Sequence, residues 1–260
     1  MKYYVVADVH GFYSELITAL TAQGFFSDNS PHKLVVCGDL FDRGKEAAKL
    51  QEFIDDLLKK DEVILIRGNH EDLTIEFVQN IDRWITKTVE RTHHWRNGTV
   101  ETVLQLTGMT LGEAIAAPDR CAIKMENTPF FKRIIPAMVN YFETEQYIFV
   151  HGWIPCHTLR YPGGMTYFLL DETWRDASEK DWDSARWYNG MEAAKQGVKE
   201  PGKTIVCGHW HCSYGHASIQ GKGDESGPFA DYSPYYNEGI IAIDACTVIS
   251  RKVNCIVLEE

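Results

Sequence analysis

Short apolar runs alternate with longer amphipathic segments in the first quarter of the chain. The apolar runs predict β-strands, because each is four or five residues long and rich in branched side chains. The segments between them carry apolar residues at helical spacing. The predicted strands are residues 3–7, 34–37 and 63–66, and the predicted helices are residues 14–23 and 45–60. This order predicts a parallel sheet with crossover helices on its faces.

The rest of the sequence has a less regular pattern of apolar and polar residues. Residues 72–146 are mostly helical in character, while residues 155–203 form a mixed, aromatic-rich stretch, and residues 212–238 predict a loop because glycine and proline interrupt them. Further strands are expected at residues 147–150 and 204–207, and a terminal hairpin from residues 240–244 and 253–258. We expect one domain, residues 1–260, with insertions at about 72–146, 155–203 and 212–238.

Composition narrows the classes of partner. The net charge is −11, so the surface as a whole is not a nucleic-acid footprint. No apolar run reaches the ~20 residues that span a bilayer, and the chain enters a strand at once, leaving no room for a signal peptide. The seven cysteines are scattered without a CxxC pair, which favours buried free thiols in a reducing compartment. We therefore expect a cytoplasmic protein without nucleic-acid or membrane partners.

Five short polar runs each follow a predicted strand. Because carboxyl ends of parallel strands meet at one sheet edge, the runs are expected to converge there. Asp8 and His10, two apart, are expected to share one face. Mixed carboxylate, amide and imidazole donors suit Mn, Fe, Zn or Ni better than Mg or Ca, and closed structural zinc sites prefer cysteine. The runs are residues 8–10, 38–44, 68–71, 151–152 and 208–211.

Taken singly, each run is weak. Asp-x-His or Gly-His alone predicts a metal ligand only rarely, and Asn69 beside His70 is equally typical of a turn. The prediction of a metal site therefore depends on all five runs together, because each of them follows a predicted strand.

In these runs the chain resembles the calcineurin-like metallophosphoesterases, most closely the bacterial form of the serine/threonine protein phosphatase branch. The resemblance covers the strands and their polar ends, but not residues 155–203 or most of the glycine-rich loop. The matching stretches are residues 8–11 with Glu15 and Leu16, then 38–44, 67–71, 149–152 and 208–209, with a weaker match at 95–98 and 102–104. The resemblance implies a four-layer α/β/β/α sandwich with helical and loop insertions.

The resemblance also implies two divalent cations, with manganese favoured over Fe, Zn or Ni. One cation would take Asp8, His10 and a shared Asp39. The other would take Asp39, Asn69, His151 and His209. A bridging water, ionised as hydroxide, would then attack phosphorus.

The remaining roles come from the same resemblance. Arg43, Arg67 and Asn69 would bind the phosphoryl group, since planar guanidinium groups suit phosphate. His70 would protonate the leaving oxygen, and Asp42 would orient His70 and favour its charged form. The family's later phosphate-binding arginine has no clear counterpart, although Arg175 and Arg186 lie in the right interval.

Two residues depart from the protein phosphatase pattern. His211 follows His209 by two positions, as in much of the wider superfamily, and we expect it to bind the first cation. Trp210 resembles the Gly-His-Trp of symmetrical diadenosine-tetraphosphate hydrolases. Its ring would either stack a base or simply pack in the core.

Three functions follow from these features. The first is a serine/threonine protein phosphatase-like hydrolase of phosphomonoesters on a protein or small molecule. The second is a hydrolase of dinucleoside polyphosphates or other nucleotides, favoured by Trp210 and opposed by Asp42 and Glu71. The third is a metal-bound phosphate-sensing scaffold without turnover, disfavoured by the presence of both His70 and Asp42.

Overall fold

Two five-stranded sheets form the centre of the computed structural model, which describes residues 1–87, 92–160 and 166–260. The first sheet has the order β12 (Ile256–Glu259), β1 (Lys2–Val6), β2 (His32–Cys37), β3 (Val63–Ile66) and β4 (Met138–Val139). The second has the order β10 (Tyr235–Asn237), β11 (Ile240–Ala242), β9 (Thr204–Cys207), β6 (Tyr147–Phe149) and β5 (Phe142–Glu143). Strands β1, β2 and β3 pair in parallel, which confirms the predicted opening of the chain.

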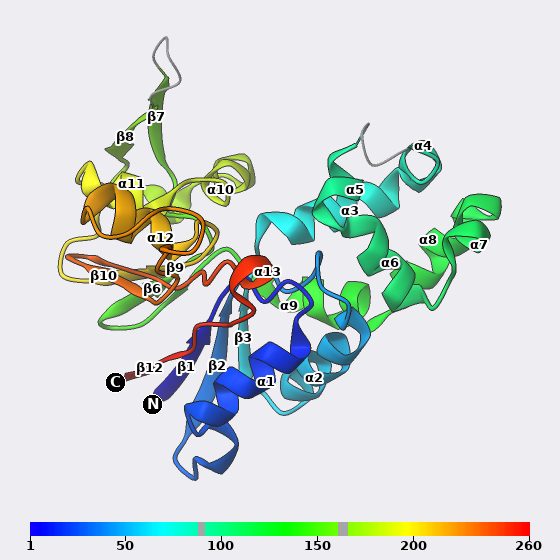
Figure 1. The fold of residues 1–260 in the computed structure, drawn as a ribbon, viewed down its shortest axis with the longest axis horizontal. Helices are drawn as coiled ribbons and strands as arrows, with labels where there is room; N and C mark the ends of the chain where they lie inside the picture. The colour runs from blue at the N-terminus through cyan, green and yellow to red at the C-terminus, as the bar shows by residue number, and fades with distance from the viewer. Residues whose placement is uncertain (88–91, 161–165) are drawn as a thin grey trace.

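Three apolar cores separate four layers. Val5, Cys37 and Ile66 from the first sheet pack with Phe149 and Val206 from the second, so the two sheets face each other. The outer face of the first sheet packs on α1 (Tyr13–Ala22) and α2 (Ala47–Lys59). The outer face of the second packs on α10 (Glu179–Ala185) and α11 (Gly190–Lys195). The predicted α/β/β/α sandwich is therefore confirmed (Figure 1).

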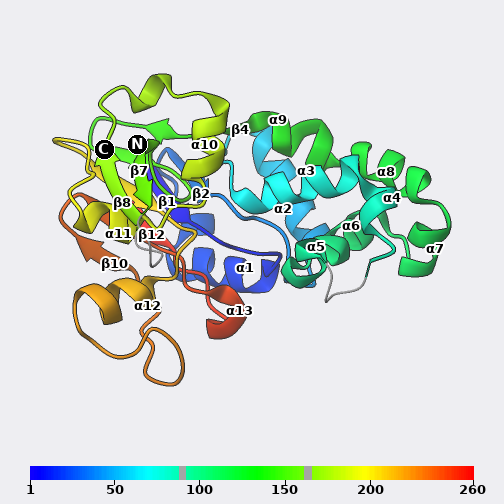
Figure 2. The same ribbon diagram turned by 90° about the horizontal axis from the view of Figure 1, so that it is seen from above.

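The helical insertion after β3 makes a lobe to one side of the sheets. Figures 1 and 2 both show its short helices gathered opposite the hairpin of β7 (Cys156–Arg160) and β8 (Thr166–Leu170). The insertion contains α3 (Asn69–Gln79), α4 (Ile81–Trp84), α5 (His93–Asn97), α6 (Thr99–Thr107), α7 (Leu111–Ala116), α8 (Pro118–Glu126), a π-helical turn (Phe130–Ile134) and α9 (Ile135–Ala137).

Two predictions about the last fifty residues were wrong. The expected terminal hairpin does not form, because β11 pairs with β9 in the second sheet and β12 crosses back to pair with β1 in the first. The expected loop at 212–238 contains α12 (Cys212–Tyr214), a π-helical turn (Gly215–Ile219) and β10. The partner of β12 lies at the other end of the sequence, whereas β10 pairs with the neighbouring β11 across a tight turn.

Three further short elements complete the described chain. They are a 3₁₀ turn after α1 (Phe25–Ser27), a 3₁₀ turn before α10 (Trp174–Asp176) and α13 (Thr247–Ser250). Within the described ranges, none of the helices combines the length and the apolar character needed to cross a bilayer.

Candidate metal centre

The predicted ligands come from the ends of five strands in both sheets. Asp8, Asp39 and Asn69 follow β1, β2 and β3 of the first sheet, and His151 and His209 follow β6 and β9 of the second. Because the sheets face each other, the five strand ends meet at one rim. The prediction that sheet topology would gather residues 200 positions apart is thus confirmed in its geometry.

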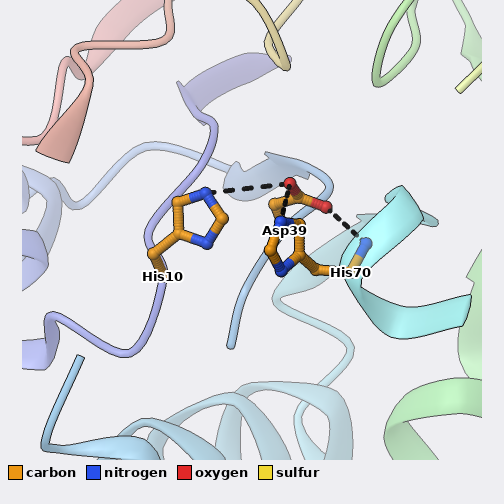
Figure 3. A group of neighbouring side chains, drawn as sticks. All are labelled: His10, Asp39 and His70. Atoms are coloured by element: carbon orange, nitrogen blue, oxygen red, sulfur yellow. Dashed lines mark hydrogen bonds and ion pairs between the residues drawn. The ribbon is translucent and has the colours of Figure 1, made fainter. Parts of the chain in front are cut away.

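Asp39 lies between two groups of potential ligands. Its Oδ1 is 3.4 Å from Nε2 of His151, while its Oδ2 is 3.7 Å from Nε2 of His10. Ligand atoms of Asp39, His151 and His209 lie within 4.8 Å of one another, as do those of Asp39, His10 and His70. Figure 3 shows the carboxylate of Asp39 between the His10 ring and the start of α3. One carboxylate with an oxygen toward each group fits a residue shared by two cations.

The backbone at this rim is strained in a consistent way. Asp8 and His10 both have φ of 51°, in the left-handed region, so they lie beyond β1 rather than on a strand face as predicted. Left-handed conformations cost roughly 1–2 kcal/mol per non-glycine residue and cluster at functional sites. The site residues with this conformation are Asp8, His10, Asp39, Asp42, Arg43 and His209.

Two glycines allow the close approach of these turns. A Cβ on Gly68 would collide with the side chain and backbone of Asp39, and a Cβ on Gly208 would collide with the carboxylate of Asp8. Oδ2 of Asp8 instead accepts a hydrogen bond from the backbone N–H of His209, at 2.9 Å. The bond joins the ends of β1 and β9, one from each sheet.

The side chains of Asn69 and His151 lie next to each other. Nε2 of His151 is 2.8 Å from Oδ1 of Asn69, and its Nδ1 is 2.9 Å from the backbone carbonyl of Cys37. That carbonyl accepts only when Nδ1 carries the proton, so Nε2 presents a lone pair beside the Asn69 oxygen, where a cation could bind both. Burial lowers the pKa of His151 and lowers that of His209 to about 3, which favours the neutral form that a metal ligand needs.

The Asp39 carboxylate stays ionised although it is buried. Burial opposes its ionisation, but the surrounding imidazoles, with His151 foremost, hold the pKa of Asp39 below its usual range. At Asp8 the net shift is the opposite: burial, reinforced by repulsion from Asp244 and Asp39, raises the pKa of this carboxyl group. Such crowding of buried acids is the electrostatic environment that a divalent cation relieves.

His70 and Asp42 form the predicted pair. Nδ1 of His70 is 2.7 Å from Oδ2 of Asp42, and the hydroxyl of Thr99 donates to the same oxygen at 2.8 Å. Burial opposes protonation of His70, yet Asp39 and the hydrogen bond to Asp42 raise its pKa. A protonated imidazole held in one orientation is suited to act as a general acid.

The two predicted phosphate-binding arginines differ in position. The guanidinium of Arg43 reaches Nε2 of His10 at 2.9 Å and Nε2 of His70 at 3.1 Å, so it lies at the centre of the site. Arg67 is ion-paired with Asp72 and borders a hollow shared with Asn69 and Trp187. Its role in binding phosphate stays a prediction.

His211 lies in neither group of potential ligands. Its Nδ1 is 2.8 Å from Oγ of Ser213, and its Nε2 is 3.7 Å from Glu225, both on the segment after β9. Its predicted role as a ligand therefore needs a change of side-chain position, and it stays a prediction.

Arg186 is buried, but it forms ion pairs with a cluster of acidic side chains away from Asp39. Its guanidinium contacts Asp72, Glu179 and Asp183, so acidic side chains occupy its donors. Arg175 pairs with Glu143 and Glu200. Among the described residues, neither arginine donates a hydrogen bond to the Asp39 centre, the group formed by Asp8, His10, Asp39, Asn69, His151 and His209.

Three residues have roles at the site that the sequence did not assign. The carboxylate of Glu71 accepts backbone N–H groups of Gly68, Asp39 and Leu40, and so shapes the turns around Asp39. Thr99 supports Asp42, and its place next to the weak match at residues 95–98 was the available signal. Trp187, whose ring contacts His209 at 5.8 Å, lies in a stretch without a recognisable motif.

Comparison with known proteins agrees with this geometry. The profile of the family described as Calcineurin-like phosphoesterase matches residues 1–213. A bis(5'-nucleosyl)-tetraphosphatase PrpE [asymmetrical] of Bacillus velezensis is 33% identical over 76 residues, which cover 27% of this chain and 30% of that protein. The protein of the same name from Anoxybacillus flavithermus is 26% identical over 98 residues, covering 35% of this chain and 40% of that one. The chain thus spans less than half the length of these curated relatives.

Among solved structures, the cold-active protein-tyrosine phosphatase of a psychrophilic Shewanella species has the same fold. Its TM-score is 0.53 at 16% identity, with 100% of this chain and 75% of that chain covered. The family profile covers most of the chain, including the five strand ends that carry the candidate ligands. The chain belongs to the calcineurin-like phosphoesterase family.

Proposed function

We propose that this protein is a metal-dependent phosphoesterase that hydrolyses phosphomonoesters, in the manner of a serine/threonine protein phosphatase. Two cations would be held by Asp8, His10 and Asp39 on one side and by Asp39, Asn69, His151 and His209 on the other, with His211 as an additional ligand of the first. When bound, such cations neutralise phosphoryl charge and activate water for attack. Manganese is the favoured metal, with Fe, Zn or Ni as alternatives.

The pair of His70 and Asp42 is the observation that favours a phosphomonoester over a nucleotide as the substrate. A serine or threonine alkoxide is a poor leaving group, so its departure requires a proton. His70 is held by Asp42 at 2.7 Å, and although burial opposes protonation, Asp39 and Asp42 raise its pKa, which favours the charged form that can donate a proton. A nucleoside diphosphate leaves readily as an anion and has less need of this pair. Arg43, within reach of both His10 and His70, would hold the phosphoryl oxygens.

The leaving group therefore provides the test. Rates of manganese-loaded wild type and His70→Asn would be compared on an alkyl phosphate, such as a phosphoserine peptide, and on p-nitrophenyl phosphate. We expect a loss of roughly 10²–10⁴-fold on the peptide and a much smaller loss on the aryl ester. Equal losses on both substrates would remove the general-acid role, and no hydrolysis of either by wild type would remove the proposed activity.

An aromatic cavity favours a second candidate, the hydrolysis of dinucleoside polyphosphates or other nucleotides. The cavity has a volume of about 880 Å³, and its lining includes Phe168, Trp187, Tyr188, Trp210 and Tyr214. Trp187, 52% exposed, borders both this cavity and the hollow beside Asn69 and Arg67. A base stacked on these rings would gain about 1–3 kcal/mol. Because the Trp187 ring contacts His209, the phosphates of that nucleotide would then lie toward Asp39 and its neighbours.

Product analysis separates the two candidates. The manganese-loaded protein is incubated with an equimolar mixture of a phosphoserine peptide and diadenosine tetraphosphate, followed by phosphorus NMR. Inorganic phosphate from the peptide supports the first candidate. Nucleotide products appearing first support the second, and Trp187→Ala should then raise KM for the dinucleotide while leaving hydrolysis of p-nitrophenyl phosphate unchanged.

A further inference from the structure

Three potential ligands gather on the helical lobe, outside the Asp39 centre. Glu76 comes from α3, and His93 and His94 come from α5; their ligand atoms lie within 4.8 Å of one another. Nε2 of His93 is 3.4 Å and Nε2 of His94 is 3.7 Å from the same oxygen of Glu76. Ligand atoms bound tetrahedrally at zinc–nitrogen and zinc–oxygen distances are about 3.4 Å apart. The group therefore needs only small side-chain movements to surround a cation.

His94 supplies an independent indication of a ligand. Its side chain is fully buried, and neither of its ring nitrogens has a hydrogen-bond partner in the part of the chain that the structure describes. A buried polar group without a partner costs about 1–3 kcal/mol. Burial, reinforced by the neighbouring His93, lowers the pKa of His94 to about 4, so the ring is neutral and keeps a lone pair for a metal.

The group is open on one side. The side chain of Glu76 is 46% exposed and that of His93 is 43% exposed, so a hydrated cation has access to both. On the other side, Phe77 and Trp84 pack against the His94 ring at 5.2 and 5.3 Å. Apolar walls behind three ligands and water in front are typical of a three-ligand zinc site with an open fourth position.

We propose that Glu76, His93 and His94 bind a zinc ion or a similar borderline divalent cation, separate from the cations of the Asp39 centre. Two imidazoles and one carboxylate match the donor preference of Zn²⁺ rather than that of Mg²⁺ or Ca²⁺. This site depends on none of the steps proposed for phosphoester hydrolysis.

A cation at this position would tie together two elements that support the His70–Asp42 pair. Helix α3 begins with Asn69 and His70 and carries Glu76 two turns later. Helix α5 ends at Asn97, and its capping residue Gly98 packs against the backbone of Arg43. The next residue, Thr99, donates to Asp42. Zinc bound between α3 and α5 is therefore expected to restrain local opening of the lobe near the pair.

Metal counting tests the site. Wild type, Glu76→Gln, His93→Gln and the control His157→Gln, which changes a histidine 73% exposed on β7, are dialysed against Zn²⁺ and analysed by mass spectrometry of the metal. We expect one zinc fewer per chain in the first two variants and the wild-type number in the control. Both tested residues are half-exposed, so circular dichroism in chelator should show an unchanged fold.

The position of Trp84 gives a second readout. Its ring lies within 6.0 Å of both imidazoles, so Co²⁺ bound to the group should quench its fluorescence. We expect a quenching phase that is lost in Glu76→Gln and in Trp84→Phe and kept in His157→Gln. Unchanged zinc content together with unchanged quenching in Glu76→Gln and His93→Gln would overturn the proposal, whether or not the protein hydrolyses phosphoesters.

Discussion

Nδ1 of His70 lies 2.7 Å from Oδ2 of Asp42, and this contact distinguishes two roles that His70 could have. As a general acid, His70 acts on the leaving group; as a ligand, it would hold a cation with His10 and Asp39, near which it also lies. The contact to Asp42 favours the acid, because the carboxylate accepts the Nδ1 proton and stabilises the charged imidazole.

His70→Asn should therefore lower kcat on a phosphoserine peptide by roughly 10²–10⁴-fold without loss of metal. Asp42→Asn should produce a smaller loss, since the imidazole remains but its orientation and charge are no longer supported. Metal content measured beside the rates checks the assignment. A His70→Asn protein that is inactive because it lacks one cation would instead make His70 a ligand.

Asp39→Asn should remove both cations together, because each oxygen of the carboxylate faces a different group of histidines. We expect activity to fall by at least about 10³-fold and metal content to approach zero after dialysis. The exposed change Asp56→Asn on α2 is a matched control that should keep both. If Asp39→Asn retained one full equivalent of bound metal, the carboxylate would be a ligand of one cation only.

His211→Ala tests the ligand role that the structure leaves open. If His211 binds the first cation, the variant should need at least about tenfold more manganese for half-maximal activity, while the second cation is unaffected. A titration of apo-protein with Mn²⁺ gives both affinities. Equal affinities in wild type and variant would leave His211 as a partner of Ser213 and Glu225 only.

Glu143 on β5 should make stability depend on pH in the acid range. Two hydrogen bonds from Arg175, with Lys203 also close, lower the pKa of Glu143 to about 2, against about 4.3 in an unfolded chain. A depressed folded pKa stabilises the protein above the unfolded value, and this contribution is lost as pH falls from about 4.3 toward 2. After allowance for its 22% exposure, the contribution is roughly 1–2 kcal/mol.

Urea unfolding of Glu143→Gln at pH 7 and at pH 3 measures this contribution. The variant should be less stable than wild type by about that amount at pH 7, and the difference should shrink at pH 3. Glu52→Gln, an exposed change on α2, serves as control. A constant difference at both values of pH would assign the effect to packing rather than charge.

Much of the fold and the centre of the site could be predicted from the sequence. Strands β3 and β9 have the predicted bounds, because continuous apolar runs bordered by polar turns identify buried parallel strands. The placement of Asp39, Asn69 and His151 at one rim was predictable for the same reason, since each follows such a run within a few residues. Here local pattern and global topology agree.

The remainder depends on contacts that no local pattern contains. The position of β12 is set by its pairing with β1, which lies at the other end of the sequence, while β11 pairs with β9 in the second sheet. Trp187 reaches His209 because α10 packs on the second sheet, and Arg186 is withdrawn into an acidic cluster by Asp72 and Glu179. Side-chain partners at these distances in sequence are decided by packing, not by propensity.

The predicted ligands divide between the sheets: Asp8, Asp39 and Asn69 follow strands of one, while His151 and His209 follow strands of the other. A cation held jointly by Asp39 and His151 would be a cross-link at the top of the inter-sheet core. The supply of metal would then affect the stability of the fold as well as the rate of hydrolysis. Chains starved of metal should open at this rim first, and proteases should cut them sooner than loaded chains, so that the amount of protein in a cell, and not only its activity, follows the available metal.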